Sequence, residues 1–276
     1  MINAQTKLYG IIGNPVRHSL SPIIHNRAFR RMGLNAVYLA FEVKNLKEAI
    51  DGIRGSGIRG VSVTIPFKTQ VIPFLDEVEA VAEKIKAVNT IVNEGGRLVG
   101  YNTDWRGGLE ALEEKVDLMG KKVLLLGAGG AARAIGFGLK EKSCEVIVSN
   151  RSPDKAKELA KDLGFIYEPL TSVSELKMDV TINATSAGMS PHDAESPLPK
   201  KSLKEGMIVM DMVYRPLRTK LLQEAEGRGC RTIDGLEMLA RQGAGQFEIW
   251  TGRRPEINQI KEDLRGVLEK EIRGEP

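Results

Sequence analysis

Three polar segments carry the side chains best suited to bind and react with a small molecule. They are GNPVRHSLSP at 13–22, SVTIPFK at 62–68 and YNTD at 101–104, and each follows an apolar run that predicts a strand. Together they supply hydroxyls, an ammonium and a carboxylate, which can hold an anion and exchange a proton. Because loops at the carboxyl ends of parallel strands converge, we expect the three segments to form one pocket.

A fourth segment, GAGGAAR at 127–133, has the composition of a phosphate-binding turn. Gly127, Gly129 and Gly130 would let a pyrophosphate approach the main chain at a helix N-terminus, where backbone N–H groups lack partners. Ala132 stands where the usual G-x-G-x-x-G pattern has its third glycine, and a small residue there still permits close helix packing. The strand-like VLLLG before this segment and the helix-compatible stretch after it favour a dinucleotide site over an ordinary glycine turn.

The residues after the next predicted strand, EVIVSN, decide which dinucleotide is expected. A site for NAD usually places Asp or Glu there, whose carboxylate binds the ribose hydroxyls and repels a 2′-phosphate. This chain has Asn150, Arg151, Ser152 and Lys155, whose cations and neutral hydrogen-bonding groups suit a phosphate dianion. We therefore predict NADP as the cofactor; the alternative is that Arg151 only caps the strand at the surface.

The segment NATSAGM at 183–189 follows another predicted strand at the same end of the sheet. Its small residues offer a surface for the nicotinamide-ribose half of the cofactor, although a plain turn would have the same composition. The predicted cofactor contacts in this segment and in the glycine turn therefore also include Thr185, Ser186, Gly188, Met189, Ala128 and Ala131.

Alternating strands and helices surround these segments. The first unit opens with the strand LYGIIG and a helix that has Ser21 as N-cap, Pro22 as first residue and Gly33 at its end. It continues with the strand AVYLAFEV, a helix in NLKEAIDGIRGSG, the strand GVSVTIP, a helix over 77–87 and a hairpin that turns at EGGR. A further helix is predicted to start near Asp104.

The second unit begins at Lys121. It predicts the strand KKVLLLG, a helix through about Lys142, the strand EVIVSN, a helix from about Pro153, and strands in DVTINAT and MIVMDMV, with HDAESPLP as a loop. This order of strands and helices is βαβ architecture. In the first unit, the strands AVYLAFEV and GVSVTIP are too apolar to have one wet face, which favours a parallel sheet with helices packed on it.

Length and composition exclude several classes of protein. A chain of 276 residues suits two domains, and no apolar run approaches the roughly 20 residues of a membrane helix. The 40 basic and 36 acidic residues are interspersed, which argues against a nucleic-acid-binding surface. No secretory signal is visible, and Cys144 and Cys230 are too far apart to indicate a disulfide framework or a metal-binding repeat. We expect a cytoplasmic protein with reduced thiols.

Seven strings occur along the chain in a fixed order: SLSP, VTIPFK, YNTD, GAGGAAR, NATSAGM, MDMVY and DGLEML. In this order they resemble the shikimate dehydrogenase family from about Tyr9 to Trp250. The resemblance implies an α/β protein of two domains: an N-terminal substrate domain with a mainly parallel sheet at 1–104, completed by helices in 238–276, and a Rossmann-type NADP domain at 105–237. It also implies the reversible reduction of 3-dehydroshikimate to shikimate with NADPH, a step of aromatic amino-acid (chorismate) biosynthesis.

The resemblance assigns roles to individual residues. Ser19 and Ser21 would bind the substrate carboxylate, although Ser21 is also what an N-cap requires. Lys68 and Asp104 would form the catalytic pair, in which the ammonium stabilises and protonates a developing oxyanion and the carboxylate orients it. Which of the two is the formal acid stays open, and a structural salt bridge is the alternative. The other implied contacts are Thr64, Asn89, Tyr214 and Gln242 for the substrate, and Gly235 and Met238 for the cofactor.

Two features stand apart from the family pattern. Ser62 replaces the Asn that many members have before VT, so one substrate hydrogen bond is expected to be shorter or replaced by water. His18, His25 and His192 occupy no catalytic position of the family, and we expect each to be structural or exposed. The chemistry requires no metal, and no His/Cys cluster offers a site for one.

Three other functions predict different features of the sequence. A quinate/shikimate dehydrogenase would differ in substrate breadth and cofactor choice. A catalytically silent relative that binds NADP or shikimate as a regulatory module would be expected to lose the Lys or the Asp. An aminoacyl-tRNA reductase-type enzyme should carry a reactive Cys in its substrate domain, and residues 1–104 contain none. We expect a small-molecule substrate and no nucleic-acid or membrane partner; monomer and homodimer both stay open.

Overall fold

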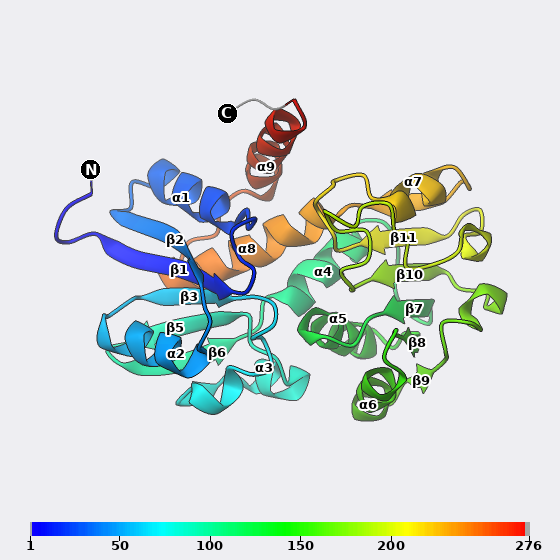
Figure 1. Cartoon of the computed structure of the whole chain (residues 1–276), viewed down its shortest axis with the longest axis horizontal. Helices are drawn as coiled ribbons and strands as arrows, with labels where there is room; N and C mark the ends of the chain where they lie inside the picture. Colours follow the sequence, from blue (N-terminus) through cyan, green and yellow to red (C-terminus); the bar gives the residue numbers. More distant parts are fainter. Residues whose placement is uncertain (1, 274–276) are drawn as a thin grey trace. The chain divides into compact units, whose positions relative to one another are not determined.

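The computed structural model describes residues 2–273 and divides the chain into two compact units (Figure 1). Unit 1 comprises Met1–Thr103 and Gln242–Pro276, and unit 2 comprises Asp104–Arg241. Helix α8 (Gly235–Thr251) begins in unit 2 and ends in unit 1. The last three residues of the expected C-terminal helical segment, 274–276, lie outside the described residues.

The sheet of unit 1 has the strand order β2-β1-β3-β5-β6-β4. The parallel strands are β1 (Lys7–Gly13), β2 (Ala36–Glu42) and β3 (Gly60–Val63). The predicted hairpin is formed by β5 (Thr90–Glu94) and β6 (Arg97–Tyr101), and the short β4 (Glu77–Val78) pairs parallel to β6. Gly95 and Gly96, both with positive φ, form the turn that the hairpin requires.

Helices cover both faces of this sheet because its inner strands are apolar on both sides. Helices α1 (Ser21–Arg31) and α8 pack on one face, against Tyr9, Ile11 and Tyr38. Helices α2 (Leu46–Gly55) and α3 (Ala80–Ile85) pack on the other, over a core that includes Ile12 and Val61. Helix α9 (Ile257–Ile272) lies beside α1, where Asp263 pairs with Arg27 at 2.7 Å.

Two local predictions for unit 1 were wrong. Helix α1 begins at Ser21, and its N-cap is Leu20, whose side chain makes no capping hydrogen bond. The helix predicted over 77–87 covers only Ala80–Ile85, because Glu77 and Val78 pair with β6 and the Glu79 carboxylate caps the helix from its start. Long-range pairing thus prevailed over helical propensity at the first residues of that segment.

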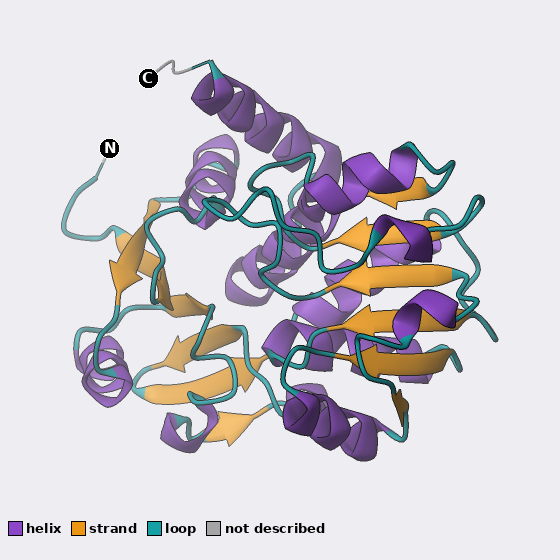
Figure 2. Cartoon of the chain, turned by 45° about the vertical axis from the view of Figure 1, so that its right-hand side comes forward, coloured by secondary structure: helices purple, strands orange, loops and turns teal. Residues whose placement is uncertain are grey.

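The sheet of unit 2 is parallel throughout and has the order β12-β11-β10-β7-β8-β9. Figure 2 shows these strands side by side with helices on both faces. The chain starts at the central β7, moves outward in one direction, and then returns to the other side of β7 at β10. This is the Rossmann-type order, so the predicted fold class is confirmed. The strands are β7 (Lys122–Leu126), β8 (Glu145–Ser149), β9 (Ile166–Tyr167), β10 (Val180–Asn183), β11 (Ile208–Asp211) and β12 (Arg231–Ile233).

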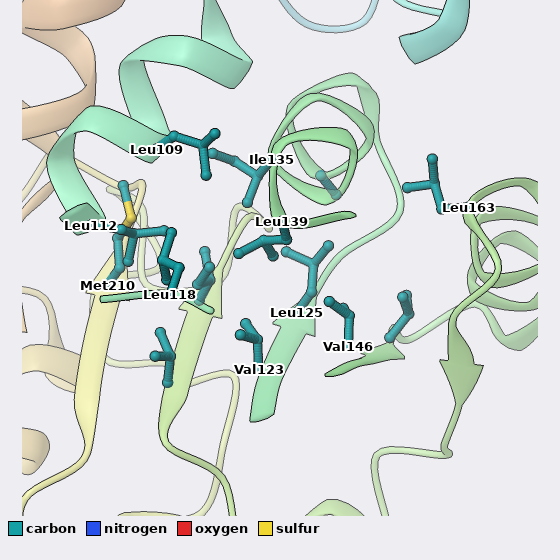
Figure 3. Packing of buried hydrophobic residues seen from close by; sticks show 14 of the residues in the cluster. Leu109, Leu112, Leu118, Val123, Leu125, Ile135, Leu139, Val146, Leu163 and Met210 are labelled. Atoms are coloured by element: carbon teal, nitrogen blue, oxygen red, sulfur yellow. The ribbon is translucent and has the colours of Figure 1, made fainter. Parts of the chain in front are cut away.

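The apolar run of β7 is explained by burial on both faces. Val123 and Leu125 face a core built with α4 (Asp104–Glu113), α5 (Gly130–Glu141) and α6 (Pro153–Leu163) (Figure 3). Leu124 and Leu126 belong to a second cluster with Val173 on the opposite face. Helix α7 (Lys220–Glu226) covers β11 and β12. Within residues 2–273, no helix is long and apolar enough to span a membrane.

Candidate functional site

The polar segments of unit 1 lie at the same end of its strands. Strands β1 and β3 run parallel, so the loops that follow them start at the same end of the sheet. Strand β5 is antiparallel to β3 and β6 is antiparallel to β5, so Asn89, just before β5, and Thr103, just after β6, also lie at that end. A Cβ at Gly13 would lie 2.4 Å from Thr64 Cγ2, so glycine allows the two loops their close contact.

The two serines of SLSP lie at the start of α1. Ser19 Oγ accepts the Ser21 backbone N–H at 3.2 Å, so Ser19 rather than Ser21 satisfies an amide at this helix N-terminus. Ser19 is half-buried and Ser21 is buried. The first turn of α1 holds no acidic residue, so its positive dipole end faces no carboxylate of its own helix. Two hydroxyls at such a position can hold an anion.

Thr64 and Lys68 lie in the turn that follows β3, and both are half-buried. The Thr64 carbonyl accepts the Phe67 N–H at 2.9 Å, and the Lys68 carbonyl accepts the Val88 N–H at 2.8 Å. Phe67 is buried in the core of unit 1 and anchors the turn from below. The backbone on both sides of the lysine is therefore held, while its long side chain keeps partial access to solvent.

Asn89 is the centre of a buried cluster of amides and hydroxyls. Its Nδ2 donates to Thr103 Oγ1 at 2.9 Å and to Gln242 Oε1 at 3.4 Å, and its Oδ1 accepts from the Thr103 N–H at 2.8 Å and from Thr90 Oγ1 at 2.7 Å. The structure thus brings together Asn89 and Gln242, which 153 positions separate in the sequence. Thr103 also belongs to this cluster; it was not predicted as a site residue, although it lies in the YNTD segment.

The predicted substrate residues are distributed over both units. Asp104, which is only 2% exposed, directly follows Thr103 and is the first residue of α4 in unit 2. Tyr214 follows β11, and burial raises the pKa of its hydroxyl. The other predicted substrate residues, Ser19, Ser21, Thr64, Lys68, Asn89 and Gln242, belong to unit 1.

The glycine turn of unit 2 links β7 to α5 as the sequence predicted. Gly127 has φ +116°, and a Cβ there would lie 2.8 Å from the Ala184 carbonyl oxygen, so only glycine fits. Gly129 is the N-cap of α5, and a Cβ there would meet no atom within 4 Å. Ala132 is fully buried against the sheet. The N-terminus of α5 therefore offers backbone N–H groups and open space beside Gly129, which suits a pyrophosphate.

The end of β8 and the residues after it differ in exposure. Ser149, the last residue of β8, is fully buried and its Oγ makes no hydrogen bond to a described residue, whereas Arg151, Ser152 and Lys155, after the strand, are exposed. The Asn150 side chain donates to the Ser152 carbonyl at 3.3 Å and closes the turn. An exposed guanidinium and ammonium beside this turn suit the 2′-phosphate of NADP.

The other arginine near the glycine turn has a structural role. Arg133, at the end of GAGGAAR, is buried and pairs with Glu158 at 2.8 Å and with Asp162 at 2.7 Å. These contacts join α5 to α6. Since the guanidinium is committed to two carboxylates, Arg151 is the better candidate for a phosphate contact.

A buried polar network holds the NATSAGM loop. Asn183 Nδ2 donates to Asp211 Oδ1 at 2.9 Å, Thr219 Oγ1 donates to Asp211 Oδ2 at 2.6 Å, and Thr185 Oγ1 donates to Asn183 Oδ1 at 2.6 Å. Burial raises the pKa of Asp211 to about 6, although these donors favour its charged form. Asp211 was not predicted; its one signal is an acid inside the apolar run MIVMDMV.

The remaining predicted cofactor residues also lie in unit 2. Ser186 and Met189 are exposed on the NATSAGM loop, and Gly188 has φ +84°, a backbone conformation that favours glycine. A Cβ at Gly235 would lie 2.5 Å from the Val213 carbonyl oxygen, so the start of α8 requires glycine. Met238, one turn further, is buried.

The three histidines behave as expected. His18 and His192 are exposed, and His25 is fully buried on α1, stacked on Tyr38 with ring centroids 4.3 Å apart. Gln246 lies close enough to His25 to affect the pKa of the imidazole, but neither ring nitrogen makes a hydrogen bond of good geometry to a described residue. Burial lowers the pKa of His25 to about 3, so its imidazole stays neutral down to acidic pH.

We expect His25 to make the protein acid-sensitive. Its pKa is about 3 when folded and 6.5 in the unfolded chain, so only the unfolded state takes up this proton as pH falls from 6.5 towards 3. Between pH 7 and about pH 4.5, wild type should lose about 2.5 kcal/mol more unfolding free energy than His25→Phe, as measured by urea unfolding. The exposed-site control His192→Gln should keep the wild-type loss; an equal loss in His25→Phe would contradict the assignment.

Comparisons with known proteins agree on one family. Residues 11–91 match the shikimate dehydrogenase substrate binding domain, 110–237 match shikimate / quinate 5-dehydrogenase, and 235–265 match the shikimate 5'-dehydrogenase C-terminal domain. A shikimate dehydrogenase (NADP(+)) of Thermococcus kodakarensis is 49% identical over 276 residues, which covers 98% of this chain and 100% of that protein.

Solved structures agree as well. A shikimate dehydrogenase crystallised with NADP+ is 44% identical, with a TM-score of 0.92 over 97% of this chain and 98% of the other. A shikimate 5-dehydrogenase of Thermus thermophilus, in complex with NADP(H) and shikimate, is 40% identical, with a TM-score of 0.87 over 94% and 99% of the two chains. The similarity therefore extends over both units.

Proposed function

Because this chain belongs to the shikimate dehydrogenase family, we propose that it catalyses the reversible, NADPH-dependent reduction of 3-dehydroshikimate to shikimate in aromatic amino-acid biosynthesis. The observation that carries the proposal is the pairing of two sites in one chain. In unit 1, hydroxyls, amides and Lys68 lie at the same end of the strands. In unit 2, the N-terminus of α5 follows a glycine turn. We assign substrate binding to the first and NADP binding to the second.

The proposed cofactor residues fit the parts of NADP by their chemistry. The backbone from Gly127 to Ala131 would hold the pyrophosphate, and Asn150, Arg151, Ser152 and Lys155 would hold the adenosine 2′-phosphate. We assign the nicotinamide half to the segment that the Asp211 network stabilises and to the start of α8, that is, Thr185, Ser186, Gly188, Met189, Gly235 and Met238. Bound NADPH would supply the hydride that reduces the ketone carbon.

The protein's own residues would handle the charge and the proton. Ser19 and Ser21 would hold the substrate carboxylate at the start of α1, which orients the ring. Lys68 would stabilise the negative charge that develops on the ketone oxygen and donate a proton to it, while Asp104 orients the ammonium. Thr64, Asn89, Tyr214 and Gln242 would contact the substrate hydroxyls. Without Lys68, the negative charge on the ketone oxygen would have to be stabilised by water.

The first test is a reduced-nicotinamide absorbance assay with purified protein. Shikimate and quinate are each supplied with NADP and with NAD. Rapid reduction with shikimate and NADP alone is the expected result, since exposed cations follow β8. Comparable rates with quinate or NAD would favour the broader quinate/shikimate enzyme, and no reduction in all four mixtures would favour the regulatory relative.

Assembly and location are separate proposals. We propose a cytoplasmic homodimer; the free thiols of Cys144 and Cys230 support a reducing compartment, and Leu39, 46% exposed on edge strand β2, offers an apolar contact to a second copy. Sedimentation equilibrium is expected to give twice the mass of the 30.3 kDa chain. A mass of one chain at all concentrations would overturn the dimer.

A further inference from the structure

A buried chain of hydrogen bonds in unit 1 joins three elements that are far apart in the sequence. The Tyr38 hydroxyl on β2 donates to Ser62 Oγ on β3 at 2.6 Å, and Ser62 donates to Gln246 Oε1 on α8 at 2.8 Å. Gln246 Nε2 then donates to the backbone oxygen of Asn89 at 2.9 Å. None of these four residues is more than 3% exposed. The chain of bonds therefore has no competition from bulk water.

The direction of each bond follows from what each group can donate. A backbone carbonyl only accepts, so Gln246 must turn its Nε2 towards Asn89 and its Oε1 towards Ser62. Ser62 has one proton and must give it to that oxygen. Its own oxygen is then an acceptor, so Tyr38 supplies the next proton. The sequence of donors is thus fixed from Tyr38 to Asn89.

This polarity leaves Ser62 no proton for a ligand. Its single hydroxyl hydrogen is bound to Gln246, and it is 3% exposed. The Tyr38 hydroxyl, in contrast, can accept a hydrogen bond as well as donate one, and the Ser21 side chain lies close enough to interact with it. The Tyr38 ring is held in place by stacking on His25. Tyr38 thus stands between Ser21 at one end of the proposed substrate site and, through Ser62 and Gln246, Asn89 at the other.

We propose that Tyr38 and Ser62 are positioning residues of the substrate site. They hold Ser21 and Asn89 at fixed positions relative to each other and do not contact the substrate. This inference rests on the proposed function. It deepens that function because it assigns a role to Ser62, which replaces the Asn of many family members. Ser62 connects Tyr38 to Gln246. Gln246 lies one helical turn after Gln242, so the same connection also fixes the face of α8 that presents Gln242 to Asn89.

The test compares Tyr38→Phe and Ser62→Ala with the control Tyr9→Phe. Tyr9 is a buried tyrosine of the same aromatic cluster, 5% exposed, and lies outside the chain of bonds. We expect Tyr38→Phe to raise KM for shikimate about tenfold, with kcat within about twofold and KM for NADP unchanged, because a lost buried hydrogen bond is worth about that factor. Tyr9→Phe should leave all three constants unchanged.

The double variant Tyr38→Phe/Ser62→Ala shows whether Ser62 acts through Tyr38 or contacts the substrate directly. If both residues act through one connection, its KM should be no higher than that of Ser62→Ala alone, whereas multiplied effects would mean that Ser62 contacts the substrate directly. Its Tm should also exceed that of Ser62→Ala, which removes the Ser62 acceptor of the buried Tyr38 hydroxyl. Should one variant not fold, the other supplies the KM comparison.

Failure of this inference is distinguishable from failure of the proposed function. An active wild type whose KM for shikimate is the same in Tyr38→Phe and Tyr9→Phe would overturn the positioning role. A fall in kcat with KM unchanged would overturn it as well. A wild type that does not oxidise shikimate would instead overturn the function on which the inference rests.

Discussion

Replacing Lys68 by methionine is expected to lower kcat for shikimate oxidation about a thousandfold. Removal of a positioned acid–base group typically costs a factor of about 10² to 10⁴, and here the same ammonium would also stabilise the oxyanion. Methionine keeps much of the length of the half-buried side chain and removes its charge, so the turn after β3 should keep its backbone bonds. Single-turnover absorbance measurements give the rate of hydride transfer directly.

Two further variants test whether the loss of kcat is specific to the Lys68 ammonium and its partner Asp104. Asp104→Asn should also lower kcat, by a smaller factor if the carboxylate only orients the ammonium. The control Lys84→Met removes an exposed ammonium from α3 of the same unit and should retain wild-type kcat. If Lys68→Met kept kcat within about threefold of wild type, Lys68 would be no more than a structural partner.

Reversing the charge at Arg151 is expected to reduce kcat/KM for NADP about a hundredfold. Arg151→Glu removes an exposed cation after β8 and puts a carboxylate beside the position assigned to the 2′-phosphate. A lost charge-assisted hydrogen bond is worth about 1.5–3 kcal/mol, and like-charge repulsion adds to that loss. With NAD, which lacks the phosphate, kcat/KM should stay the same or rise, because Glu can bind the ribose hydroxyls.

Steady-state kinetics with both cofactors test this expectation. Lys177→Glu makes the same charge change at an exposed position of unit 2 and should leave the preference between NADP and NAD unchanged. An equal fall with both cofactors in Arg151→Glu would mean that the substitution disturbs the turn and not a phosphate site. Raising the salt concentration should reduce the wild-type preference for NADP, because an exposed charge pair is screened.

Local signals were sufficient for much of the architecture. The runs LYGIIG and VLLLG predicted β1 and β7 because a strand buried on both faces must be apolar throughout. Helix α6 begins at Pro153 as predicted, since a proline suits the first turn of a helix. The glycines of GAGGAAR predicted the turn between β7 and α5, because the conformation at Gly127 excludes other residues.

Tertiary contacts decided the rest, because they join residues that no local pattern relates. The two arginines near the glycine turn look alike in sequence, and only the packing of α6 shows that Arg133 is committed to carboxylates. Likewise, only the structure shows that Asp211, on β11, bonds Asn183 at the start of the NATSAGM segment and Thr219 at the N-cap of α7. The residue types that carry the chemistry were thus determined locally by the sequence, whereas their orientation depends on buried hydrogen bonds between distant strands and helices, as between Tyr38 and Ser62.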